Sequence, residues 1–142
     1  MEGATAAAGA SDGGGAGRRI VERGARGIDE DDVRRVVERA DDITRRFKKR
    51  GPLARFLNDG RLFVSLVRDY WSGRYRQVPF GTLAAVAFTL LYVLNPLDLV
   101  PDVLPFIGQL DDAAIVSAAL LLVEGDLRRY RRALGGEADE MP

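Results

Sequence analysis

The run VPFGTLAAVAFTLLYVL, residues 78–94, decides the fold of this chain, because it contains no charged residue. Pro79 stands where proline is tolerated, in the first turn of a helix. The Asn95-Pro96 pair that follows ends such a helix. At 1.5 Å per residue the predicted helix is about 25 Å long, near the lower limit for crossing a hydrocarbon core of about 30 Å. The run therefore predicts an apolar helix that is able to span a membrane but is not required to.

A second apolar helix is predicted downstream, beginning at Asp111 or Asp112. It is apolar on every side over residues 113–123, becomes amphipathic as far as Leu134, and meets Gly135-Gly136 as a stop signal. The two apolar helices form a predicted hairpin over residues 78–123. Small residues at a spacing of four are expected to let the two helices approach closely: Gly81 and Ala85 on the first, Ala114 and Ala118 on the second. Residues 135–142 are expected to be an acidic tail.

Two amphipathic helices are predicted before the hairpin. In residues 28–50 apolar side chains recur every three or four residues until Gly51-Pro52. A second stripe predicts a helix over residues 59–72, preceded by a short turn of helix and ended by Gly73. Residues 1–27, rich in Gly and Ala, are expected to be a disordered tail. The sequence thus predicts an all-α fold with about four main helices.

Composition excludes most reaction chemistry. The 142 residues fit one domain, and 21 basic residues balance 21 acidic ones, so the net charge offers no attraction to nucleic acid. The chain has no His and no Cys, which removes the commonest general base, the thiol nucleophile and the usual zinc ligands. We therefore expect a protein that is not an enzyme, with no catalytic residue, no metal centre and no cofactor.

A proline- and aspartate-rich segment joins the two apolar helices. It reads Pro-x-Asp-x-x-Pro-Asp, then Pro-x-x-Gly, then Asp-Asp, and its marked positions are Asn95, Pro96, Asp98, Pro101, Asp102, Pro105, Gly108, Asp111 and Asp112. With its surroundings, over residues 61–123, this pattern resembles the YkvA-like family, a small helical domain of unknown function. The resemblance implies a domain over residues 51–134 in a membrane protein with more than one apolar segment. It implies no shared activity.

The carboxylates of this segment permit two interpretations. Asp98, Asp102, Asp111 and Asp112 would supply oxygen ligands to Mg²⁺ or Ca²⁺, or pass protons. Alternatively they cap helices, with Asp98 at a short helix and Asp111 and Asp112 at the start of the last one. We favour capping, because the spacing lacks the pattern of a calcium-binding loop.

Arginines flank both ends of the predicted hairpin. The candidate contacts to lipid headgroups are Arg74, Arg76, Arg128, Arg129, Arg131 and Arg132. The basic cluster over residues 45–50 would also contact phosphates. For these groups a solvated helix surface is the favoured interpretation, followed by lipid and then by nucleic acid.

The same apolar residues fit two environments. If the hairpin faces lipid, the chain is a membrane protein, multi-pass or re-entrant, with both termini in the cytoplasm because the basic residues flank the hairpin. If it faces the two amphipathic helices, the chain is a cytoplasmic four-helix interaction module. We favour the membrane, because the last helix is apolar all round. The expected role is structural or partner-docking, with membrane lipid and an unidentified protein as partners, no nucleic acid, and self-association left open.

Overall fold

The computed structural model describes residues 8–49, 51–95 and 112–139, which contain seven α-helices and one 3-10 helix and no strand. This confirms the all-α prediction. There are more helices than the predicted four, because two predicted helices are divided and a further helix precedes them. In chain order the helices are α1 (Ala8–Ala25), α2 (Glu30–Glu38), α3 (Ala40–Lys48), η1 (Pro52–Phe56), α4 (Leu57–Ser72), α5 (Phe80–Leu94), α7 (Asp112–Leu122) and α8 (Glu124–Asp139).

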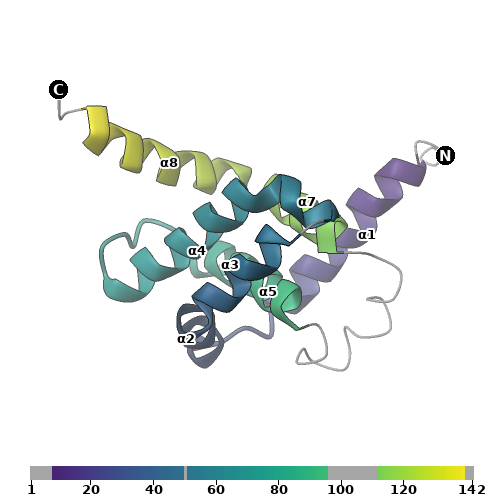
Figure 1. Ribbon diagram of the computed structural model, residues 1–142, viewed down its shortest axis with the longest axis horizontal. Helices are drawn as coiled ribbons and strands as arrows, with labels where there is room; N and C mark the ends of the chain where they lie inside the picture. The colour runs from purple at the N-terminus through teal and green to yellow at the C-terminus, as the bar shows by residue number, and fades with distance from the viewer. Residues whose placement is uncertain (1–7, 50, 96–111, 140–142) are drawn as a thin grey trace.

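The apolar helix α5 is the centre of the molecule (Figure 1). It contacts α1, α2, α3, α4 and α7, and every residue from 83 to 94 is buried. The buried hydroxyl of Thr89 donates a hydrogen bond of 2.8 Å to the carbonyl of Ala85, so this hydroxyl is paired within the helix. Residues 83–94 have no polar face, and the surrounding helices cover every side of this stretch.

The first helix, α1, differs from the predicted disordered tail. Residues 8–25 are helical, and α1 packs against α7 and α5. Ile20 and Val21 are buried, while Gly17 and Gly24 bring the backbone of α1 close to α7 and α5 respectively. Glycine disfavours helix locally, which is the reason for the incorrect prediction, but packing of an apolar face supplies most helix stability in proteins. Residues 1–7 lie outside the described part of the chain.

The single amphipathic helix predicted over residues 28–50 is divided into α2 and α3. The division falls at Arg39, with φ −107° and ψ 19°. The amide of Arg39 still donates to the carbonyl of Arg35, and the carbonyl of Arg39 accepts from the amide of Ile43. Because the chain bends there without losing its hydrogen bonds, both halves turn their apolar stripes onto α4 and α5.

Helix α2 begins with a capping box. The side chain of Asp29 accepts from the amide of Asp32, and the side chain of Asp32 accepts from the amide of Asp29, both at 3.0 Å. The backbone bond from Asp32 is the main reason why the pKa of Asp29 lies below its ordinary value.

The predicted turn of helix before residue 59 is present as η1, and α4 runs from Leu57 to Ser72. Gly73 ends α4 as predicted, with φ 88° in the left-handed region that favours glycine.

The predicted last helix is also divided, at Val123, into α7 and α8. Helix α7 contacts α5, as a hairpin requires, but its most extensive contact is with α1. A Cβ atom on Gly17 of α1 would lie 3.0 Å from that of Ala118, whereas one on Gly81 would have no neighbour within 4 Å. The small residues of α7 therefore face α1 and not Gly81. Helix α8 continues past Gly135-Gly136 to Asp139, so the tail predicted over residues 135–142 is helical over its first part.

Across residues 8–49, 51–95 and 112–139, no helix combines the length and the apolar composition that crossing a bilayer requires. This finding does not support the multi-pass form predicted for the hairpin over residues 78–123, whereas its re-entrant form stays a prediction.

Candidate functional site

Two of the nine predicted motif residues lie in the described part of the chain. The amide of Asn95 donates to the carbonyl of Leu91 at 2.8 Å and ends α5, and Asp112 lies in the first turn of α7. The other positions lie outside the described residues: Pro96, Asp98, Pro101, Asp102, Pro105, Gly108 and Asp111. Capping and cation binding by this segment both stay predictions. Elsewhere, among the described residues, no group of three or more acidic side chains is placed to hold a metal ion.

The four arginines predicted to contact lipid from α8 are all exposed, and three of them pair with carboxylates. Arg128 lies 3.4 Å from Glu124, Arg129 lies 3.5 Å from Asp126, and Arg131 lies 3.5 Å from Asp59 of α4. Exposed pairs of this kind contribute little to stability. They orient three guanidinium groups along the surface, and a lipid phosphate would have to compete with the carboxylates for them.

Arg74 and Arg76 belong to an aromatic corner where α4 turns into α5. We define the aromatic corner as Tyr70, Trp71, Arg74, Arg76 and Phe80. Trp71 and Phe80 are each 41% exposed, and both line a surface cavity of about 240 Å³ with Tyr70 and Arg76. The guanidinium of Arg76 lies 4.7 Å from the centre of the Tyr70 ring, which is cation–π geometry. The cavity at the corner thus brings two large apolar rings beside the exposed Arg76, and Glu30 lines it as well. Arg74 is exposed close by in the chain, where it lies 3.8 Å from the carboxylate of Asp69.

A polar network lies beneath this corner and joins α4 to α8. The buried Tyr130 donates a hydrogen bond of 2.6 Å to the carboxylate of Asp69, and its hydroxyl lies 2.5 Å from that of Ser65. The ring of Tyr75 packs against the ring of Tyr130 with centres 5.0 Å apart. Burial, followed by the bond to Asp69, raises the pKa of Tyr130 to about 12. The network is satisfied internally, so its role is to hold α8 against α4.

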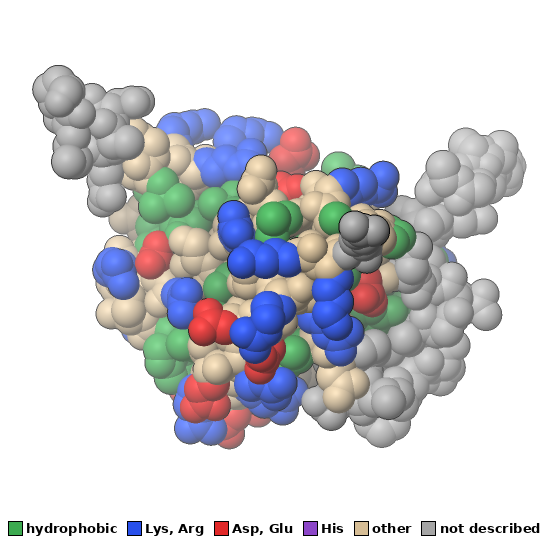
Figure 2. Space-filling view, in the orientation of Figure 1, with side chains coloured by type: hydrophobic (Ala, Val, Ile, Leu, Met, Phe, Trp, Pro, Cys, Tyr) green, Lys and Arg blue, Asp and Glu red, His purple; other side chains and the backbone are tan. Residues whose placement is uncertain are grey.

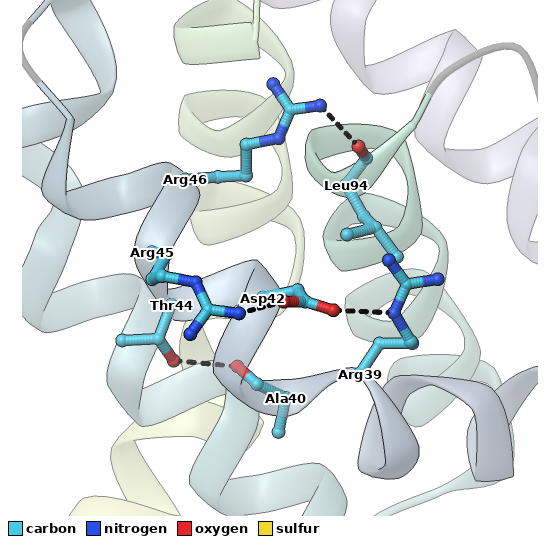
Figure 3. Close-up of polar contacts among 7 residues, drawn as sticks. All are labelled: Arg39, Ala40, Asp42, Thr44, Arg45, Arg46 and Leu94. Carbon is cyan, nitrogen blue, oxygen red and sulfur yellow. Dashed lines mark hydrogen bonds and ion pairs between the residues drawn. The ribbon is translucent and has the colours of Figure 1, made fainter.

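A basic groove lies between α3 and the C-terminal end of α5 (Figure 3). It has a volume of about 440 Å³, and its lining residues are Arg39, Asp42, Arg45, Arg46, Lys49, Leu94 and Asn95. Arg46 donates a hydrogen bond of 2.9 Å to the carbonyl of Leu94, one of the last carbonyls of α5. That carbonyl carries the partial negative charge of a helix end, so the contact fixes Arg46 at the mouth of the groove.

Asp42 is the carboxylate of the groove lining, and it lies between two arginines. Arg39 donates to one carboxylate oxygen at 2.8 Å and Arg45 donates to the other. These bonds, that of Arg39 first, hold the pKa of Asp42 below its ordinary value, so it is ionised at neutral pH. Lys49 has no acidic partner in the part of the chain that the structure describes. Among the described residues that line the groove, four cationic side chains therefore share one carboxylate.

Sequence reasoning identified the cluster over residues 45–50 but not the groove. The excess of bases in the last turn of α3 was visible, since Arg45, Arg46 and Lys48 follow one another closely. The position of Leu94 beside them was not, because 48 residues separate Arg46 from Leu94. Nor did the sequence indicate that Trp71 and Phe80 are exposed, because each belongs to an apolar segment, and such a segment predicts burial.

The chain resembles proteins whose activity is undefined. Residues 82–118 match the family described as "Protein of unknown function (DUF1232)". A relative in Bacillus subtilis (strain 168), "Uncharacterized membrane protein YkvA", is 33% identical over 70 residues, which are 49% of this chain and 66% of that protein. No solved structure matches the chain. Both matches support the YkvA-like family that the motif predicts, and the chain spans somewhat less than two thirds of the length of this relative. The roles assigned to single motif residues stay predictions.

Proposed function

We propose that this chain is a non-catalytic, membrane-associated helical module that attaches to the surface of an anionic membrane through the aromatic corner. The observation that carries the proposal is the exposure of Trp71 and Phe80 beside Arg76, with the exposed Arg74 close by in the chain. Aromatic rings favour the boundary between headgroups and acyl chains, and basic side chains next to them attract anionic lipid. The printed name of the Bacillus relative, a membrane protein, supports the same setting.

Attachment at the surface fits the way α5 is enclosed. Helices surround residues 83–94 of α5, so this buried stretch offers no apolar surface to lipid. The large apolar side chains exposed on the described part of the chain are Trp71 and Phe80 of the aromatic corner, with Leu121 and Leu134 elsewhere. The absence of His and Cys from the sequence supports a structural or partner-docking role, as do the caps and ion pairs that several carboxylates form among the described residues. This role belongs to the proposal and is tested separately from membrane attachment only by identifying a protein partner.

Trp71 is the only tryptophan of the chain, so its fluorescence reports on the aromatic corner without a label. We expect its emission to shift to shorter wavelength with vesicles of phosphatidylcholine and phosphatidylglycerol, because the indole moves out of water. Pure phosphatidylcholine should give a much weaker response, and added salt should weaken the anionic one. Each basic residue near an anionic surface contributes about 1 kcal/mol, so Arg74→Gln with Arg76→Gln should weaken vesicle binding about tenfold or more.

The matched control is the pair Arg128→Gln with Arg132→Gln, which removes the same charge from α8. A loss as large in this control would assign binding to net charge and not to the corner. Phe80→Ser tests the apolar contribution and should also weaken binding. If anionic vesicles leave the Trp71 emission of the wild-type protein unchanged, and the protein stays in the supernatant when the vesicles are sedimented, the membrane proposal is wrong. The alternative is then an interaction module that does not bind lipid.

A further inference from the structure

We infer that the basic groove is a binding site for a phosphomonoester group. Its four cationic side chains come from α3 and the residues directly before and after it, and they line a groove with the C-terminal end of α5. One of them, Arg46, donates to the carbonyl of Leu94. The inference does not rest on the proposed membrane attachment, because the aromatic corner shares no residue with the groove.

The chemistry of the lining favours phosphate. A guanidinium presents N–H donors in a fork that matches two oxygens of one phosphate, and three guanidinium groups line the groove. Arg46 is already anchored on Leu94, so it has less side-chain freedom to lose on binding. Arg39 and Arg45 pair with Asp42, so a phosphate competes with this one carboxylate for them. A dianionic phosphomonoester offers more charge to these cations than a carboxylate does.

Figure 2 shows how basic side chains gather over α2 and α3 with acidic ones between them. Most of these acids pair within their own helix, as Glu38 does with Arg34. A larger cavity of about 630 Å³ lies between α3 and α4, but there three arginines meet two aspartates. Counted over the described lining residues, the groove at the end of α5 therefore has the greater excess of positive charge.

The groove is larger than inorganic phosphate requires. A volume of about 440 Å³ lies within the range of small-molecule sites. The ligand is therefore a phosphomonoester with a further small polar group, which is free in solution or is the headgroup of a lipid.

Calorimetric titration of the full chain with glycerol phosphate and with inorganic phosphate tests the soluble source, and vesicles of phosphatidylcholine with phosphatidic acid test the lipid source. We expect saturable binding of at least one phosphomonoester. Saturation by glycerol phosphate assigns a soluble ligand, and saturation by phosphatidic acid vesicles alone assigns a lipid headgroup.

The triple variant Arg39→Gln, Arg45→Gln, Lys49→Gln should bind at least about tenfold more weakly. The control pair Arg61→Gln with Arg68→Gln, at the neighbouring cavity, should change binding by less than about threefold.

Asp42→Asn distinguishes a ligand site from an ion-pair cluster. Removing this carboxylate releases Arg39 and Arg45, so binding should tighten several-fold, while Glu38→Gln, which removes the same charge outside the groove, should have less than about a twofold effect. No heat with any of these probes would overturn the inference. So would weaker binding in Asp42→Asn, or equal losses in the triple variant and the control at the neighbouring cavity. Because the soluble titrations contain no bilayer, their failure is distinct from failure of the Trp71 measurement.

Discussion

At the scale of single residues, polar side chains connect elements that the apolar core alone would leave loosely joined. Arg46 joins α3 to the end of α5, Thr82 donates a 2.6 Å hydrogen bond to Asp126 of α8, and Tyr130 joins α8 to α4. Each bond crosses between segments far apart in the sequence. These side chains therefore fix how the helices sit against one another.

Tyr130→Phe should lower the free energy of unfolding by about 1–3 kcal/mol, because it removes a buried hydrogen bond to a charged acceptor. Urea unfolding measures this difference. Tyr75→Phe is the matched control, since the Tyr75 ring packs on Tyr130 without a hydrogen bond of its hydroxyl in the described residues, and its cost should stay below about 0.5 kcal/mol.

Tyr130→Phe should also change how the free energy of unfolding responds to alkaline pH. In the unfolded chain Tyr130 loses its proton near its ordinary pKa of 10.0, whereas in the folded chain the pKa is about 12. Between these values the folded state binds more protons, so stability falls as the pH rises. Wild type should therefore lose stability more steeply than Tyr130→Phe over this interval, and parallel curves would contradict the assigned environment.

At the scale of elements, glycine decides how closely α1 approaches the core. A Cβ atom on Gly24 would lie 2.1 Å from the ring of Phe88, which is itself buried in α5. The ring has little room to move. The composition that locally disfavours a helix is thus what permits α1 to lie on α5.

Gly24→Ala should destabilise the protein by about 1–3 kcal/mol through overpacking, although alanine is the better helix former. Gly15→Ala on the same helix is the control, because nothing lies within 4 Å of the added methyl group there. It should be neutral or stabilise by up to about 1 kcal/mol. Equal effects of the two substitutions in thermal unfolding would indicate that α1 is not docked on α5.

At the scale of the whole molecule, the enclosure of α5 predicts a gradient of local stability. The free ends of α1 and α8 extend from the body in opposite directions (Figure 1). Amides of residues 83–94 should exchange with solvent only on global unfolding, whereas those at the end of α8 beyond Tyr130 should exchange far faster. Native-state hydrogen exchange measures both, and equal protection along α5 and the end of α8 would contradict the arrangement.

The sequence by itself determined that the chain is all-α, where the central apolar helix lies, where α4 ends at Gly73, and which family the chain resembles. These properties are local, because hydrophobic period, glycine and proline act within a few residues. The bend at Arg39, the docking of α1 and the groove beside Leu94 came only from the tertiary structure. The physical reason is that a hydrophobic pattern reports which side chains must leave water, but not which neighbour covers them, and distant charges meet only after the core has packed.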